Sequence, residues 1–234
     1  MLEYLKLVII VSIIPVFIIS GFVSSKVNSS KPFLLIVKLF FRGIFSCIPA
    51  CILEMIFVHY YGEMPKGNLL FMFIYIFLGI GLIEEVCKWF NVYKGSYHSK
   101  SVNRSYDLII YSVMVSLGFA FFENILYTLQ YGISTGLLRD FLSVPGHAMF
   151  GAFMGYYLGK AKYHSSSDHF IRKVFYIILS ILIPSLFHAI FDFLLSVNNT
   201  YYLIIFFVFI IITFKIVILK LDSMSHNNLK IKRS

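Results

Sequence analysis

The stretch Glu84-Glu85-Val86-Cys87-Lys88 places two adjacent carboxylates and an ammonium inside an otherwise apolar run from Leu69 to Phe90. That run is long enough to cross a bilayer, which takes about 20 residues of helix. A charged side chain at the centre of a membrane helix costs at least about 2.5–3.5 kcal/mol. We therefore interpret this stretch as part of a functional site. Glu84 and Lys88 are one helical turn apart and are expected to pair, which leaves Glu85 for another partner.

The composition of the whole chain is that of a membrane protein. Of its 234 residues, 59% are hydrophobic and 13% are charged, and the mean hydropathy is +0.84. A soluble domain carries about 25% charged residues. The sequence predicts an all-α, polytopic fold with a single membrane domain spanning residues 1–234. The net charge of +9 is attributed to the loops of a membrane protein and not to nucleic-acid binding.

Seven apolar stretches are each long enough to form a transmembrane helix. They are residues 7–23, 33–59, 69–92, 107–131, 139–159, 173–196 and 201–220. The loops on one side, with the C-terminal tail, hold 13 Lys and Arg residues, and the other side holds 3. Because basic residues accumulate in cytoplasmic loops, the N-terminus is predicted outside and the C-terminus in the cytoplasm. We expect a multi-pass protein of the bacterial cytoplasmic membrane.

Four further ionisable residues lie within other predicted spans: Glu123, His147, His188 and Asp192. Each of them alone is compatible with a hydrogen-bonded core residue. With Glu84 and Glu85 they make six groups on four helices, all within about 12 Å of the bilayer centre at ~1.5 Å per residue. Packing does not readily explain so many, so the six are predicted to share one site.

Local patterns suggest how some of these residues are held. Asp192 lies one turn after His188 and can orient its ring by accepting an N–H. Ser143 and Pro145 suggest a helix start that would put His147 in the first turn.

Other polar and sulfur-containing residues are assigned no role at this point. Glu54 and His59 lie near the outer end of the second span and are expected to reach the interface, outside the site. The three cysteines, Cys47, Cys51 and Cys87, are interpreted as small apolar packing residues, since their odd number argues against a disulfide framework.

Carboxylates and histidines around a polar pocket in lipid support two kinds of hydrolysis. A glutamate can act as general base on water while histidines polarise the carbonyl or bind the oxyanion. Alternatively, the residues His147, His188 and Glu85 can hold zinc with one position left for water. The cofactor is therefore zinc or none. Glu85 is the preferred base, because Lys88 is expected to occupy Glu84, although the two glutamates can exchange roles. The sequence lacks the His-Glu-x-x-His, Gly-x-Ser-Gly and Gly-x-Gly-Asp motifs of other intramembrane proteases.

The polar residues also carry a family resemblance. On successive predicted helices the chain reads Glu84-Glu85-x-x-Lys88, Phe119-x-x-x-Glu123-Asn124, His147-x-x-x-Gly151 and His188-x-x-x-Asp192. In this order the motifs resemble the PrsW family of intramembrane proteases, which is related to CAAX-prenyl-protease and bacteriocin-immunity membrane proteins. The resemblance covers roughly residues 69–196, the expected catalytic core.

The resemblance implies an intramembrane endopeptidase that cuts a single-pass membrane protein within the lipid bilayer. The expected substrate is an anti-sigma factor, whose first (site-1) cut leads to release of an extracytoplasmic-function sigma factor in a stress response. The predicted catalytic residues are Glu84, Glu85, Glu123, His147, His188 and Asp192, with Lys88 and Asn124 in support. Two alternatives stay open: a proton-coupled transporter, in which such groups form proton relays, and a non-catalytic immunity or scaffold protein.

Overall fold

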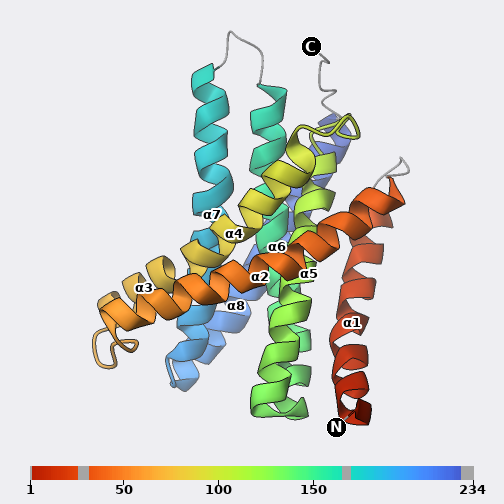
Figure 1. Ribbon diagram of the computed structural model, residues 1–234. Helices are drawn as coiled ribbons and strands as arrows, with labels where there is room; N and C mark the ends of the chain where they lie inside the picture. Colours follow the sequence, from red (N-terminus) through yellow and green to blue (C-terminus); the bar gives the residue numbers. More distant parts are fainter. Residues whose placement is uncertain (1, 26–31, 165–169, 228–234) are drawn as a thin grey trace.

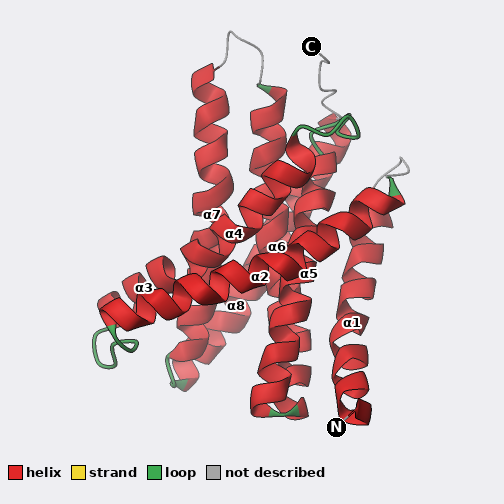
Figure 2. Ribbon diagram, viewed as in Figure 1, coloured by secondary structure: helices red, strands yellow, loops and turns green. Residues whose placement is uncertain are grey.

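The computed structural model describes residues 2–25, 32–164 and 170–227, and all regular structure in these ranges is helical (Figure 2). Helix α3 (Leu69–Ile76), the π-helical turn η1 (Phe77–Gly81), helix α4 (Leu82–Val92) and the π-helical turn η2 (Tyr93–Tyr97) follow one another without a break and make one rod. The other rods are α1 (Leu2–Ser25), α2 (Phe33–Tyr61), α5 (Asp107–Tyr131), α6 (Ile133–Tyr163), α7 (Phe170–Ser196) and α8 (Thr200–Asn227). These seven rods correspond to the seven predicted spans, and the all-α polytopic fold is confirmed.

One rod differs from the others in its apolar content. Six rods are long and apolar enough to cross a membrane by length and composition, and α6 is not among them. Helix α6 is largely buried and packs most extensively against α5 and α7. A helix surrounded by other helices does not face lipid, so it can carry the polar residues that a lipid-facing helix excludes.

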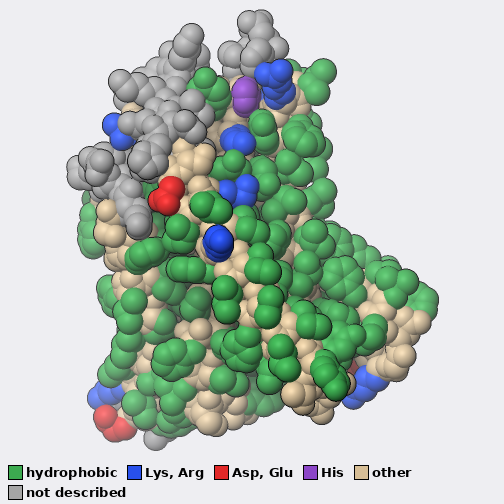
Figure 3. Space-filling model, turned by 180° about the vertical axis from the view of Figure 1, so that it is seen from behind, with side chains coloured by type: hydrophobic (Ala, Val, Ile, Leu, Met, Phe, Trp, Pro, Cys, Tyr) green, Lys and Arg blue, Asp and Glu red, His purple; other side chains and the backbone are tan. Residues whose placement is uncertain are grey.

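The rods run alternately up and down, so α1 begins at the lower end of the bundle and α8 ends at the upper end (Figure 1). Seen from behind, hydrophobic side chains cover most of the surface, and most of the visible Lys and Arg side chains lie in the upper half (Figure 3). The upper end is the one that the loop charges predict to be cytoplasmic. The orientation itself stays a prediction.

The orientation predicts the behaviour of fused reporters. A reporter joined after Lys230 is expected to be active only as a cytoplasmic fusion, and one inserted at residues 62–68, between α2 and α3, only as an external fusion. Paired alkaline phosphatase and fluorescent protein fusions measure this directly. An external C-terminus would contradict the orientation.

Helix α2 crosses the bundle obliquely, and glycines allow the crossing (Figure 1). A Cβ added at Gly43 would collide with the backbone of α5 at Val115, and one added at Gly118 would collide with the backbone of α2 at Phe40. Small residues at such a contact let two membrane helices approach closely. This crossing fixes α2 against α5 and so sets one wall of the site described below.

We expect Gly118→Ala to destabilise the protein, because its new Cβ meets backbone and cannot be accommodated by a side-chain rotation. Overpacking of this kind costs typically about 1–3 kcal/mol. Gly21→Ala in α1 is the matched control, since nothing lies within 4 Å of a Cβ at that position. Thermal unfolding of the two detergent-solubilised variants makes the comparison, and equal midpoints would refute the role of the crossing.

The helix start suggested by Ser143 and Pro145 is wrong. Helix α6 begins at Ile133 and continues through Pro145, so His147 lies in the middle of a helix and not in its first turn. Prolines are tolerated within membrane helices because neighbouring groups can satisfy the freed backbone carbonyl. The proline pattern alone does not distinguish this case from a true helix start.

Candidate active site

The acidic pair begins helix α4 directly after a π-helical turn. The turn η1 ends at Gly81, where an added Cβ would lie 2.9 Å from the backbone oxygen of Ser185 on α7. This close approach brings the first turn of α4 against α7, and both Glu84 and Glu85 are buried there. Single π-helical turns inside α-helices occur often at functional sites, because they rotate the residues that follow them.

Lys88 is fully buried and binds both glutamates. Its Nζ lies 2.9 Å from Glu84 Oε2, 2.8 Å from Glu85 Oε1 and 3.0 Å from His147 Nδ1. The ammonium also lies 4.0 Å from the centre of the Phe119 ring. The expected pairing of Lys88 with Glu84 is present, but the expectation that it would leave Glu85 free is wrong. Because an ammonium donates three hydrogen bonds, Lys88 can hold two carboxylates and a histidine together.

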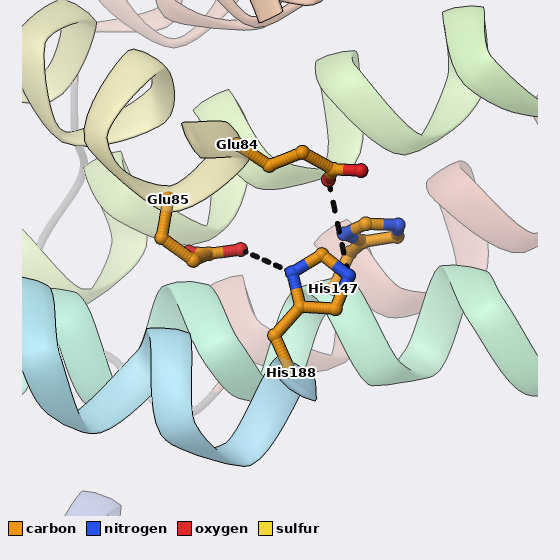
Figure 4. Close-up of side chains that lie close together, drawn as sticks. All are labelled: Glu84, Glu85, His147 and His188. Carbon is orange, nitrogen blue, oxygen red and sulfur yellow. Dashed lines mark hydrogen bonds and ion pairs between the residues drawn. The ribbon is translucent and has the colours of Figure 1, made fainter. Parts of the chain in front are cut away.

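His188 lies between carboxylates from two helices. Its Nδ1 is 3.1 Å from Glu85 Oε1, and its Nε2 is 3.3 Å from Asp192 Oδ2 and 3.9 Å from Glu84 Oε2. Figure 4 shows the His188 ring pointing toward both glutamates and lying close to His147. The centres of the two imidazole rings are 5.1 Å apart. Asp192 therefore contacts His188 as the sequence predicts, from the next turn of the same helix.

His147 contacts Glu123, which is paired with Arg139. The sequence predicts Glu123 in this site but not Arg139. The Nε2 of His147 lies 2.9 Å from Glu123 Oε2, and the other oxygen of Glu123 is 2.8 Å from an Arg139 nitrogen. Arg139 also stacks over the Tyr127 ring, with 3.7 Å from its Cζ to the ring centre. Arg139 is one of the three basic residues that the loop charges place on the outer side. Its spacing of eight residues from His147 on one helical face was the available signal.

Asn124, predicted as a supporting residue of the site, points elsewhere. Its Nδ2 lies 2.6 Å from Asp140 Oδ1, 3.4 Å from the Gly136 backbone oxygen and 3.5 Å from Ser12 Oγ. These contacts join α5 to α6 and α1, away from the cluster of glutamates and histidines. Buried polar groups need such partners, so the supporting role of Asn124 is in packing these helices.

The cluster borders a cavity of about 640 Å³. Its polar lining includes Glu84, Glu123, Arg139, His147, His188 and Asp192. Glu85 and Lys88 do not line the cavity and are fully buried behind it. The lining also includes Glu54, so the expectation that Glu54 lies outside the site is wrong, whereas His59 is exposed and does not border the cavity. The oblique course of α2 turns Glu54 inward, and the residue's position near the end of its span did not reveal this.

The cavity reaches one end of the bundle. Its lining extends to Gln130 and Tyr131 at the end of α5 and to Leu195 and Ser196 at the end of α7. Both helices finish at the lower end, which the loop charges predict to lie outside (Figure 1). A peptide segment can therefore approach the carboxylates from that end.

An all-helical membrane protein with carboxylates and histidines joined around an open cavity has the features of an intramembrane hydrolase. The chain belongs to the PrsW family: the model described as "PrsW family intramembrane metalloprotease" matches residues 31–218. It is thus an intramembrane protease and a multi-pass protein of the cell membrane. This assignment replaces the two alternatives, a transporter and a non-catalytic scaffold protein.

Curated relatives agree with this assignment. The chain is 36% identical to Protease PrsW of Bacillus subtilis over 185 residues, covering 77% of this chain and 79% of the relative. It is 34% identical to Protease PrsW of Oceanobacillus iheyensis over 193 residues, covering 82% and 85%. Protease PrsW of Clostridioides difficile is 29% identical over 227 residues, covering 95% and 93%. No solved structure matches the chain.

The family description implies a metal ion, and four buried residues of the site are its candidate ligands. Glu84, Glu85, His147 and His188 each offer a ligand atom, and the four atoms lie within 4.8 Å of one another. These donor types suit zinc. However, Lys88 Nζ lies within 3.0 Å of Glu84, Glu85 and His147, so an ion bound by those atoms would meet an ammonium at close range. The arrangement fits a carboxylate pair bridged by one ammonium and does not fit zinc without displacement of Lys88.

Proposed function

We propose that the protein hydrolyses a peptide bond with Glu84 as the general base that activates water. The observation that carries this proposal is the position of Glu84: it lines the cavity, beside the His188 ring, while Lys88 holds its carboxylate from behind. A general base must lie within reach of the water whose proton it accepts. Among the adjacent glutamates only Glu84 meets this condition, and this reverses the preference for Glu85 drawn from the sequence.

Glu85 then serves as a positioning residue. Its Oε1 accepts from Lys88 and faces His188 Nδ1, and its side chain has no exposed surface. Carboxylates lie at both ring nitrogens, Glu85 at Nδ1 and Asp192 at Nε2, and this arrangement holds the ring as an imidazolium with an N–H on each nitrogen. Glu85 therefore turns His188 Nε2 toward the cavity, where Asp192 contacts the same atom.

The second histidine is positioned from both sides. The Lys88 ammonium can only donate, so His147 Nδ1 is the acceptor and its Nε2–H donates to Glu123. Arg139 completes this chain by binding the other oxygen of Glu123. In the proposed site His147 and Glu123 hold Lys88 and the cavity wall in place, and His188 faces the reacting groups.

The reaction balances with these groups alone. Glu84 takes a proton from water, and the resulting hydroxide attacks the carbonyl carbon of the peptide. As the imidazolium held between Glu85 and Asp192, His188 donates from its Nε2–H to the oxyanion that forms, which is the usual role of a fixed donor in such a site. The C–N bond then breaks, and Glu84 passes its proton to the leaving amine. No oxidant, reductant or further group is needed.

The substrate we propose is a single-pass membrane protein, and the resemblance to the PrsW family indicates an anti-sigma factor. The course of the cavity supports a first cut near the outer end of the substrate's span, because the lining reaches the predicted outer end of α5 and α7. Such a cut is the site-1 step that would lead to release of an extracytoplasmic-function sigma factor.

Co-expression with tagged single-pass anti-sigma factors tests this function. The wild-type protein is expected to produce a shortened, membrane-bound fragment, and His188→Ala is expected to leave the substrate intact at an equal membrane level. Mapping the new terminus of the fragment locates the cut. Fragments of the same size with both proteins would refute the proposed site, and a cut at the cytoplasmic end would refute the proposed entry path.

A further inference from the structure

Two thiols on helix α2 face the cavity from the wall that crosses the bundle. Cys47 and Cys51 lie one turn apart, both line the cavity, and their sulfur atoms are 3.8 Å apart. Neither forms a disulfide. The interpretation of these cysteines as packing residues explains their apolar surroundings, and a hydrogen bond between the two sulfurs accounts for their contact. It does not explain why both thiols border the polar space next to Glu84.

The distance between the two sulfur atoms matches the separation of two thiolates bound to the same metal ion. Zinc binds thiolates at about 2.3 Å with tetrahedral geometry, so two sulfurs on one ion lie about 3.8 Å apart. Cys47 and Cys51 therefore can bind a single ion without a shift of the helix. A disulfide instead needs the sulfurs at about 2.05 Å, and their present separation does not approach that.

A third ligand is available on the same face of the helix. Glu54 follows Cys51 by three residues, which places it on the neighbouring turn of the same face, and it lines the same cavity. Its carboxylate and the two sulfurs do not lie within 4.8 Å of one another, so a change of the Glu54 side-chain rotamer brings it to the ion. A carboxylate oxygen is an accepted zinc ligand beside thiolates, and water can complete four-fold coordination. Arg139 is the Lys or Arg side chain that borders the cavity among the described residues, and it is paired with Glu123. At the other cluster, by contrast, Lys88 contacts the candidate ligands directly.

We propose that Cys47, Cys51 and Glu54 form a binding site for a thiophilic divalent cation such as Zn²⁺, and that the bound ion obstructs the cavity and inhibits cleavage. Binding breaks two S–H bonds and forms two sulfur–metal bonds, and the two protons leave to cavity carboxylates or water. The oxidation states do not change. The inhibitory part rests on the proposed function of this cavity, whereas the binding of the ion does not.

Cadmium is the probe, because a thiolate–cadmium bond gives an ultraviolet charge-transfer band. Purified, reduced wild-type protein titrated with Cd²⁺ is expected to show this band, and the double variant Cys47→Ser/Cys51→Ser is expected to lack it. Cys87→Ser is the matched control, because Cys87 belongs to the same apolar cluster but does not line the cavity. It should keep the band.

Cleavage measured in the same samples tests inhibition. The Cd²⁺ concentration that halves cleavage is expected to rise at least about ten-fold in the double variant relative to Cys87→Ser. A missing band in wild type, a band that survives in the double variant, or equal inhibition in all three proteins would overturn the proposal. Cleavage by wild type without Cd²⁺ is recorded first, so failure of the protease itself is seen separately.

Discussion

Glu84→Gln is expected to lower the rate of substrate cleavage by about 10²–10⁴-fold, the contribution of a positioned general base. The amide keeps an oxygen that can accept the hydrogen bond from Lys88, so the fold should persist. Cleavage of a co-reconstituted single-pass substrate, corrected for the amount of folded protein, measures the effect.

Two further variants make this result specific. Glu63→Gln carries the same substitution on an exposed residue between α2 and α3, and it should cleave like wild type. Glu85→Gln should lose activity through a displaced His188, with a thermal midpoint that falls as well, because a fully buried network is broken. An active Glu84→Gln protein beside a stable but inactive Glu85→Gln protein would assign the base to Glu85.

Lys88→Met is expected to destabilise the folded protein by about 3–5 kcal/mol, the usual effect of removing one partner from a buried ion pair. Without the ammonium, two adjacent buried carboxylates share His188 alone in place of Lys88 and His188 together. Thermal unfolding in detergent and the level of protein in the membrane measure the loss.

The same substitution elsewhere provides the control. Lys38 lies exposed on α2, so Lys38→Met should leave the midpoint unchanged. Adding Glu85→Gln to Lys88→Met should recover part of the stability, because it removes one of the two orphaned charges, but it should not recover cleavage. If Lys88→Met unfolds no more easily than Lys38→Met, Lys88 does not neutralise the pair.

The sequence predicted the set of helices well, because membrane helices reveal themselves by length and hydropathy. It also predicted which spans carry the polar cluster. Glu84, Glu85, His147 and His188 converge in the structure, and Glu123 and Asp192 contact the two histidines. The cost of burying charge in lipid is high enough that a group of ionisable residues in several spans indicates a common location.

What the sequence could not predict depends on the rotation and tilt of each helix. The π-helical turn before α4 and the oblique course of α2 decide that Glu84 and Glu54 face the cavity. The contact of Asn124 with Asp140, and of Arg139 with Glu123, depends in the same way on how α5 and α6 face each other. Hydropathy locates a helix in the membrane but contains little information on which neighbour each polar side chain meets.

We propose that Glu84, bound to Lys88 and not to a metal ion, activates the water that cleaves the peptide. The most direct test is cleavage by purified protein in lipid nanodiscs after exhaustive chelation, with metal analysis of the same sample. We predict an undiminished rate with far less than one metal ion per chain, and removal of an ion from Cys47 and Cys51 would only raise it. Stoichiometric zinc, with cleavage lost on its removal and restored by zinc alone, would contradict the account.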